Sequence, residues 1–394
     1  MNVGIGLSVS NFLRVPTVPL DPDQVIADLF DAGGGTFYEG AWYDPSDLTT
    51  LYQDAAGTTP VTGTGQPVGL MLDKSKGGVS ATELVTNGTF DVDEADTSDW
   101  DTSGLASTGE SVGGVFRVTT LVSNGRQMSS ISLVAGKTYI ITSKARKVSG
   151  TGTALIGVSY ASGSTFIPFP QTTSSSFVDL TQIFTATSNG GHVVAGASAN
   201  GNGVYEFDNI SIRELPGNHA TQSTSTARPT LQTSGGLYYL DFDGVDDYIT
   251  TTFTSAQAQP NTLALGYKYD DAAQLGTLID SPGANRHAFY TETGNTKYYA
   301  GLAPIIKGTT TVDEVAIVHF NTTSSSARIN GVDYGTANVG ANAWGGIRMG
   351  ANTTPVRWTD ARLYSLVGVN RTLTAGEIAS LETYLATKSG VTLP

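Results

Sequence analysis

The pattern of hydrophobic and polar positions is clearest in the stretch LYYLDFDGVDDYIT, which spans Leu237–Thr250. Leu240 and Phe242 alternate there with Asp241 and Asp243, and a glycine with two further aspartates precedes a second apolar run. A period of two predicts a half-buried β-strand, and the acidic glycine segment predicts a tight turn into another strand. Such a strand needs a second sheet to cover its apolar face, so we expect a β-sandwich.

Similar runs, separated by Gly, Asn and Ser, predict strands through most of the chain. Before residue 216 they are Gly114–Thr120, Ser130–Val134, Thr138–Lys147, Ala154–Tyr160, Phe177–Ala186, His192–Ala197 and Val204–Arg213. After it they are Thr262–Lys268, Gly276–Asp280, Ala288–Thr291, Lys297–Gly301, Glu314–Asn321 and Ala361–Val369. Asn330 and Gly331 predict a type I′ hairpin, because both turn residues need a positive φ. The strand density before residue 216 is typical of a jelly roll.

Two stretches carry helical patterns. Asp23–Phe30 places apolar residues at spacings of three and four, and glycines from Gly33 onward end the pattern. Near the C-terminus, Thr374 and Glu377 form a capping box, and Gly390 ends the second helix. The apolar stripe of this helix consists of Ile378, Leu381 and Leu385. We expect the stripe to seal one end of a sandwich.

The first ten residues, Met1–Ser10, alternate large apolar residues with Gly, Asn and Ser and precede a proline-rich hinge. This pattern predicts an extended strand with one apolar face. The strand either completes an edge of this protein's own sheet or adds to a neighbouring subunit. Both alternatives remain open, and in the second the segment is an anchoring arm.

Composition agrees with an all-β protein. A length of 394 residues predicts two or three domains, and a hydrophobic content of 39% is enough for each to have a core. The 47 Gly, the 17 Tyr and a charged content of only 14% are typical of a protein made of strands and turns. The lack of cysteine excludes disulfides, thiolate catalysis and cysteine zinc sites. The net charge is −14 and no segment is basic, so nucleic acid is not an expected partner. No apolar run is long enough for us to expect membrane insertion.

Catalytic motifs are missing from the sequence. The four histidines, His192, His219, His287 and His319, do not form an HExxH pair, and there is no GxSxG elbow, P-loop or paired-carboxylate strand. Each histidine is expected to be a satisfied polar residue, and His219 to be structural. Asp241 and Asp243 are assigned to turn chemistry. We therefore expect no enzymatic activity.

One segment, residues 77–216, has its own start and finish. It opens with LVTNGTFD at Leu84–Asp91, continues through an acidic loop to Trp100, and closes with FDNISI at Phe207–Ile212. These features resemble the jelly-roll carbohydrate-binding modules appended to polysaccharide-degrading enzymes. The resemblance implies that Asp208 is a ligand of a structural calcium ion. The acidic loop itself is interpreted as a solvated loop rather than a calcium site; its acids are Asp91, Asp93, Glu94, Asp96, Asp99 and Asp101.

The flanking residues carry a second resemblance. The motifs are GAWYDPSDL from Gly40, DKS from Asp73, GNHATQ from Gly217, RPT from Arg228 and FDGVDDY from Phe242. They resemble concanavalin A-like or laminin G-like sandwich domains of bacteriophage structural proteins, in which DKS leads straight into GNHATQ. Here the carbohydrate-module-like segment separates the two motifs, so we infer an insertion. The predicted domains are 1–39 (arm and short helix), 40–76 plus 217–394 (concanavalin A-like sandwich) and 77–216 (inserted jelly roll).

Sugar binding would need exposed aromatic rings. The candidate rings are Tyr160, Phe166, Tyr298, Tyr299, Trp344 and Trp358, whereas Trp42 and Trp100 are expected in cores. The resemblances imply a phage virion protein, such as a fibre, decoration protein or baseplate adhesin, that binds host-surface polysaccharide. Its other expected partners are virion proteins bound through the arm and copies of itself, for instance in a trimer. It would be assembled in the host cytoplasm and exposed on the particle. A polysaccharide depolymerase and a purely structural virion component are the alternatives.

Overall fold

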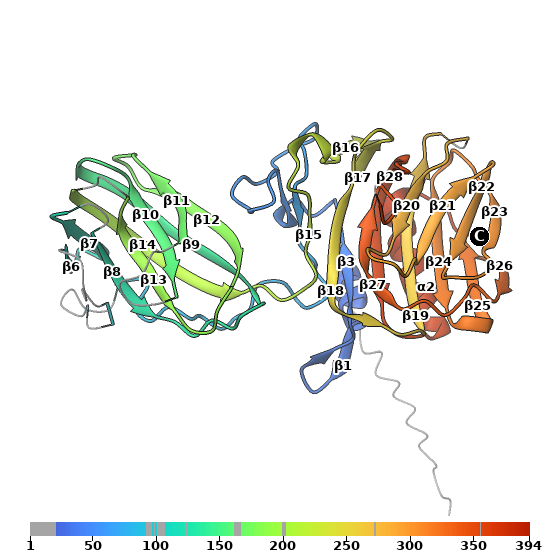
Figure 1. Ribbon diagram of the computed structural model, residues 1–394, viewed down its shortest axis with the longest axis horizontal. Coiled ribbons are helices and arrows are strands. Elements are labelled where there is room, and N and C mark those ends of the chain that lie inside the picture. Colours follow the sequence, from blue (N-terminus) through green and yellow to red (C-terminus); the bar gives the residue numbers. More distant parts are fainter. Residues whose placement is uncertain are drawn as a thin grey trace, which may run out of the picture.

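The computed structural model describes residues 21–91, 97, 99–100, 107–122, 125–160, 167–198, 202–271, 273–354 and 356–394. The predicted strand Met1–Ser10, Phe166 and most of the acidic loop lie outside the described residues. The all-β prediction is confirmed: the described strands form antiparallel β-sandwiches (Figure 1). One core draws on residues 41–71 and 220–366, and another on residues 85–212. We call the two units the host sandwich (residues 40–76 and 217–394) and the inserted sandwich (residues 77–216).

The host sandwich has two large sheets. One is nine-stranded, in the order β23-β22-β21-β20-β27-β18-β15-β5-β4, and we call it the uncovered sheet. Its strands are β4 (Leu51–Tyr52), β5 (Leu70–Met71), β15 (Ala220–Thr221), β18 (Ile249–Gln257), β20 (Thr277–Asp280), β21 (Ala288–Glu292), β22 (Asn295–Tyr299), β23 (Ile305–Gly308) and β27 (Trp344–Met349). The 3₁₀ turns Leu48–Thr50, Ser225–Ala227 and Thr322–Ser324 lie between strands.

The other sheet is eight-stranded, in the order β16-β17-β28-β19-β24-β25-β26 with β3 also paired to β28, and we call it the helix-covered sheet. Its strands are β3 (Gly40–Tyr43), β16 (Thr230–Ser234), β17 (Leu237–Asp243), β19 (Asn261–Tyr269), β24 (Glu314–Phe320), β25 (Ser325–Ile329), β26 (Val332–Ala337) and β28 (Asp360–Val369). The predicted turn between β25 and β26 is confirmed, since φ is 50° at Asn330 and 79° at Gly331.

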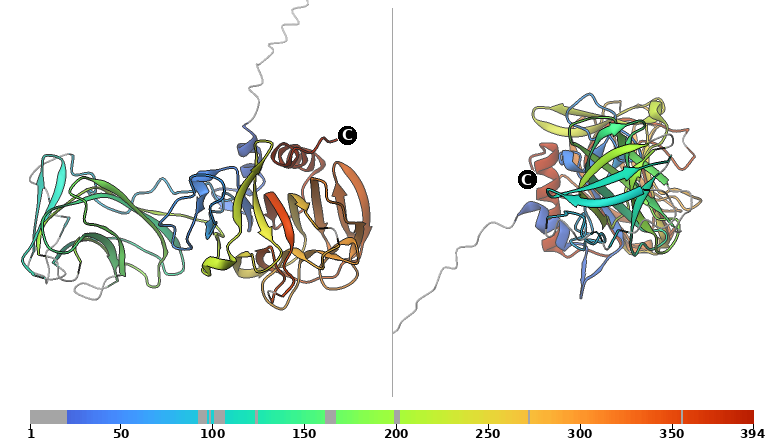
Figure 2. Two further views of the ribbon diagram at one scale, coloured as in Figure 1. Left: turned by 90° about the horizontal axis from the view of Figure 1, so that it is seen from above. Right: turned by 90° about the vertical axis from the view of Figure 1, so that its left-hand side faces the viewer.

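Two helices cover the outer face of this sheet: α1 (Pro22–Asp28) and α2 (Ala375–Ser389) (Figure 2). The capping box of Thr374 and Glu377 and the left-handed Gly390 are as predicted. The expectation that α2 seals an end of the sandwich is wrong. The sheet has apolar residues on both faces, so that Leu263 and Leu265 of β19 face the core while Ala264 faces the helices. The described helices include none that is long and apolar enough to cross a membrane.

The inserted sandwich pairs a five-stranded sheet with a four-stranded one. The strands of the first are β6 (Ser107–Val112), β7 (Val115–Thr120), β9 (Thr138–Gly150), β12 (Val178–Thr185) and β14 (Gly203–Glu214). Those of the second are β8 (Arg126–Ser130), β10 (Ala154–Ser159), β11 (Ile167–Thr172) and β13 (His192–Ala197). Trp100 packs against Phe90 and Phe116 in the core, as expected. The strand predicted at Ser130–Val134 instead ends at Ser130. A small hairpin of β1 (Asp31–Gly33) and β2 (Thr36–Phe37) precedes β3.

The two ends of the inserted segment meet at Asp73, which is 1% exposed. Its Oδ1 accepts hydrogen bonds from the backbone N–H groups of Trp42 and Ser75, each at 2.8 Å. Its Oδ2 accepts from the Ser75 hydroxyl at 2.8 Å and from the Asn218 N–H at 2.7 Å. The N–H of Asp73 in turn donates to Nδ1 of His219 at 3.0 Å, so the histidine is a structural residue here. The chain therefore leaves and re-enters the host sandwich at one place.

A small apolar cluster joins the two sandwiches. Tyr52, Leu70 and Leu72 of the host pack against Ile183 and Leu215. The N–H of Ile183 also donates to the carbonyl of Ala56 at 3.1 Å. The five-stranded sheet of the inserted sandwich is thus the one that touches the host.

Replacing Asp73 by Asn tests the importance of this carboxylate. The amide nitrogen would face two donors instead of accepting from them, so we expect the host sandwich to lose about 2–3 kcal/mol of unfolding free energy. Chemical denaturation measures the loss. Asp179→Asn, at an exposed position on β12, is the matched control and should change stability by less than about 0.5 kcal/mol. Equal effects of the two substitutions would contradict the assignment.

The burial of His287 predicts how the stability of the host sandwich depends on pH. Its ring is 1% exposed, neither nitrogen has a partner, and burial lowers its pKa to about 3. Below pH 6.5, His287 binds a proton in the unfolded chain but stays neutral in the folded chain. The free energy of unfolding therefore falls by about 1.4 kcal/mol for each pH unit, down to the pKa of His287 in the folded chain. His287→Phe should remove this contribution, because a phenyl ring needs no partner. Urea midpoints of both proteins should diverge progressively from pH 6 to pH 4, and parallel curves would refute the interpretation.

Candidate functional site

A groove lies on the five-stranded sheet of the inserted sandwich. Strand β7 pairs with β14 only as far as Phe207, and beyond this point the segment from Glu83 to Gly88 runs beside β14 instead. Leu84 N–H donates to the Ile212 carbonyl at 3.0 Å, and Ile210 N–H donates to the Gly88 carbonyl at 2.9 Å. A Cβ atom on Gly88 would lie 2.0 Å from the Ile210 carbonyl oxygen, so only glycine permits this close approach.

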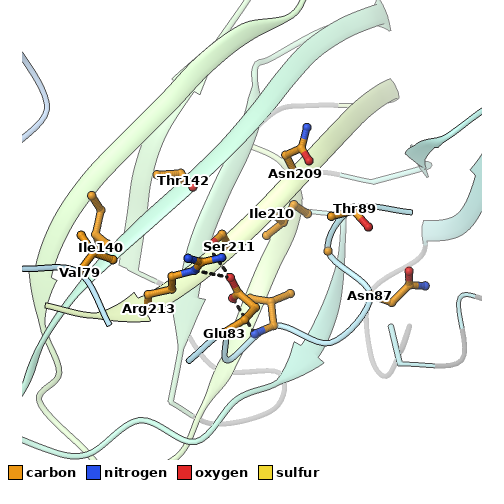
Figure 3. Close-up of a pocket in the computed structure, with 12 residues that line it drawn as sticks. Val79, Glu83, Asn87, Thr89, Ile140, Thr142, Asn209, Ile210, Ser211 and Arg213 are labelled. Atoms are coloured by element: carbon orange, nitrogen blue, oxygen red, sulfur yellow. Dashed lines mark hydrogen bonds and ion pairs between the residues drawn. The ribbon is translucent and has the colours of Figure 1, made fainter. Parts of the chain in front are cut away.

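The groove has a volume of about 870 Å³ (Figure 3). Its lining combines amide, hydroxyl and charged groups with the apolar side chains of Val79 and Ile140; the polar members are Glu83, Asn87, Thr89, Thr142, Asn209, Ser211 and Arg213. Asn87 and Asn209 have φ values of 50° and 51°, a conformation that asparagine tolerates better than most residues. These backbone conformations hold both amides at the groove.

Glu83 is the carboxylate of the groove, and it is fully engaged. Its Oε1 accepts from the backbone N–H groups of Val85 and Ile212, and its Oε2 accepts from the Ser211 hydroxyl and from Arg213 Nε (Figure 3). Burial alone would raise the pKa of Glu83, but these hydrogen bonds outweigh it and lower the pKa. The group therefore stays ionised and fixes the wall of the groove.

The aromatic residues singled out in the sequence are not brought together. Tyr298 and Trp344 are 0% and 1% exposed and lie in the host core, so the expectation that they offer rings to a sugar is wrong. Tyr160 is half-buried against the inserted core, and its hydroxyl accepts from Thr187 N–H at 2.9 Å. Tyr299 and Trp358 are half-buried in the host sandwich. Phe166 lies outside the described residues.

Carboxylates lie near one another in two places, one in each sandwich. Asp208 is partly buried, and its pKa is raised by burial and by the nearby charge of Asp91, although the Asn209 N–H and the charge of Lys144 oppose the rise. Among the described residues, the carboxylates that gather within 4.8 Å of one another are Asp243, Asp246 and Asp247. Asp243 accepts from backbone N–H groups of the same turn, as turn chemistry predicts. Burial and Asp243 raise the pKa of Asp247 to about 7.

The sequence did not identify the groove, although a signal for it was present. Asn87 lies in the LVTNGTFD motif and Asn209 in the FDNISI motif. Pairing the first and last segments of one sandwich would have placed the two amides side by side. Asn87 and Asn209 are far apart in the sequence, so the pattern of residues alone does not show that they are neighbours.

Neither a protein-family model nor a curated protein matches this sequence. A CBM4 structure is similar over 33% of this chain and 99% of its own, at 17% identity and a TM-score of 0.26. A CBM22 tandem domain of Paenibacillus barcinonensis Xyn10C is similar over 78% of this chain and 100% of its own, at 12% identity and a TM-score of 0.31. A Trypanosoma rangeli sialidase in complex with sialic acid is similar over 82% of this chain and 60% of its own, at 12% identity and a TM-score of 0.33. Similarity this low leaves the function to be judged from the side chains.

Proposed function

We propose that this chain binds glycans without cleaving them, and that the groove of the inserted sandwich is a binding site. The observation that carries the proposal is the composition of the groove. Its amides, hydroxyls and one ion pair lie beside an apolar patch of Val79 and Ile140. Such a set can hydrogen-bond sugar hydroxyls while covering the apolar face of a ring, and a volume of about 870 Å³ is within the range of ligand sites.

The same groove is poorly equipped for hydrolysis. Glycoside cleavage uses two carboxyl groups, one of which must be protonated to act as a general acid. Glu83 is held ionised by its donors, and the described lining offers no second carboxylate. This favours a binding protein over a depolymerase.

The proposed setting is the particle of a bacteriophage, where the protein would act as an adhesin for host-surface polysaccharide. Support comes from the motifs of the host sandwich, which resemble those of phage structural proteins. The N-terminal segment would attach the chain to other virion proteins. Several copies on one particle would turn weak individual contacts into useful avidity.

We propose a structural calcium ion as the cofactor. Burial raises the pKa of Asp208, and repulsion by the nearby Asp91 raises it further, whereas the charge of Lys144 lowers it. Carboxylate oxygens are the ligands that calcium prefers, and a divalent cation would remove this repulsion. Asp91 and Asp208 would hold the ion at the start of the bulge in β14, next to the groove.

The groove is tested with Thr142→Trp. Thr142 lines the groove from β9, and an indole there should fill it. The protein is assayed by calorimetry against a panel of oligosaccharides chosen from glycan-array hits of the full chain. We expect affinity to fall about tenfold or more, which corresponds to at least about 1.4 kcal/mol of binding free energy.

The matched control is Thr119→Trp, the same change on β7 of the same sheet but outside the groove. It should leave affinity unchanged. Equal losses in both variants, or no glycan bound by the full chain, would refute the proposed site. Release of new reducing ends during the assay would instead identify a depolymerase.

The calcium proposal predicts a change in thermal stability. Calcium at about 100 times its dissociation constant should add about 2.7 kcal/mol to the stability of the inserted sandwich, and a chelator should reverse this. Asp208→Asn should abolish the effect, because it removes one charged ligand. Asp179→Asn should preserve it. Stabilisation that persists in Asp208→Asn would show that the ion binds elsewhere.

A further inference from the structure

Neither described helix covers the outer face of the uncovered sheet, because both pack on the opposite sheet (Figures 1 and 2). At β4 and β5 this face packs against the inserted sandwich, and the remaining strands lie beyond that contact. Side chains alternate between the two faces along each strand. Phe289 of β21 and Tyr298 of β22 lie in the core. The next residues, Tyr290 and Tyr299, therefore lie on the outer side of the sheet, with their ring centroids 6.4 Å apart. Tyr290 is buried there and Tyr299 is half-buried.

On the neighbouring strands, two charged residues lie on the same outer side of the sheet as Tyr290 and Tyr299. Asp280 of β20 lies directly opposite Arg348 of β27. Both point outward, because the adjacent Ile279 and Met349 lie in the core. Arg286, from the loop before β21, reaches the same place: its Nε lies 2.8 Å from an oxygen of Asp280. We call Asp280, Arg286, Tyr290, Tyr299 and Arg348 the arginine strip.

Asp280 fixes the geometry of the strip although it is completely buried. Besides Arg286, it accepts hydrogen bonds from the backbone N–H groups of Ser281 at 2.9 Å and Thr353 at 3.2 Å. The guanidinium of Arg286 consequently lies over two rings, with its central carbon 5.3 Å from the centroid of Tyr290 and 5.9 Å from that of Tyr299. Arg286 is thus held in place by a carboxylate and two aromatic rings.

Arg348 is held in a similar way from the other side. Its Nη1 donates to the backbone carbonyls of Asn352 and Thr353, and its guanidinium lies 5.0 Å from the ring centroid of Tyr248. Its Nε is buried and has no partner, and the same is true of Nη2 of Arg286. The strip therefore contains two guanidinium groups for one carboxylate, and more N–H donors than acceptors, in a chain whose net charge is −14.

We propose that the arginine strip binds the carboxylate of an acidic saccharide, with Arg286 and Arg348 as the recognising residues. Guanidinium groups bind carboxylates through paired, charge-assisted hydrogen bonds, and the strip supplies two that are already oriented. A carboxylate would balance the local excess of positive charge. It would contact the accessible part of the guanidinium groups, and the Arg286 side chain is 29% exposed.

A saccharide is favoured as the carrier of the carboxylate by what surrounds the arginines. The row continues beyond Arg348 through Thr250 and Thr221 on the next two strands, which adds hydroxyl groups that can meet sugar hydroxyls. On the other side, Tyr299 offers the half-buried ring that a pyranose face requires. The strip lies on a different sandwich from the groove, so this proposal is independent of the proposed function.

The test uses the full chain and two matched probes. One is an oligosaccharide of glucuronic acid residues, and the other is the same oligosaccharide after reduction of its carboxyl groups to alcohols. Calorimetry should show binding of the acidic probe, weakened about tenfold or more by reduction. Arg348→Gln should weaken binding of the acidic probe to the same extent. Arg286→Lys should also weaken it, because lysine keeps the charge but loses the planar fork.

The matched control is Arg362→Gln. Arg362 also pairs with an aspartate, Asp270, at 2.6 Å and lies 4.9 Å from a tyrosine ring, but on the helix-covered sheet. Affinity should stay within about twofold in this variant. Thermal unfolding confirms that each variant is folded. Equal binding of both probes, equal losses in Arg348→Gln and Arg362→Gln, or no binding of the acidic probe at millimolar concentration would overturn the proposal.

Discussion

The hydrogen bonds to Asp73 are the constraint on which the arrangement of the two sandwiches depends. This one carboxylate binds the start of the host sandwich at Trp42, the exit of the chain at Ser75 and its return at Asn218. Directly beside it, β5 pairs with β15, so the host sheet continues as if the inserted residues were not there. A long insertion is tolerated at such a place, because both of its ends are held and the entropy of a closed loop grows slowly with its length.

The helices decide which host surface can bind a ligand. Strands β19, β24 and β28 are apolar on both faces, and α2 covers the face that the second sheet does not. The uncovered sheet has the opposite character: its inner face is apolar, while its outer face carries tyrosines, arginines and threonines. An antiparallel sheet with one polar face is stable in water, which leaves that face available for recognition.

Features that depend on residues close in sequence could be predicted, and features that depend on the choice of face could not. The capping box at Thr374 and the turn at Asn330 each need only a few neighbouring residues, and both are confirmed. The pair Tyr298 and Tyr299 shows the limit. Alternation guarantees that the two rings point in opposite directions, but the sequence does not say which one is inside. Trp344 was misjudged for the same reason.

Charged residues posed a related difficulty at the candidate sites. Asp280 ends a strand predicted from the sequence and Arg286 follows six residues later, but strand periodicity does not show that the two side chains pair. The position of α2 was wrong because its apolar stripe fits any apolar surface, and only the two-sided burial of β19 selects one. In each case the missing information was a packing contact in the folded chain, which propensity and periodicity do not contain.

The contact between the sandwiches gives the two proposed sites a physical relation. The groove lies on the same five-stranded sheet as Ile183, whose side chain packs on Tyr52 and Leu70 of the host. This small apolar cluster, together with the anchoring at Asp73, sets the distance between the groove and the arginine strip. A glycan polymer long enough to span that distance would bind its second site as an intramolecular step, at a high effective concentration. The apolar packing between the sandwiches, which reaches the groove at Ile140, would then influence how strongly the whole chain binds a polymer.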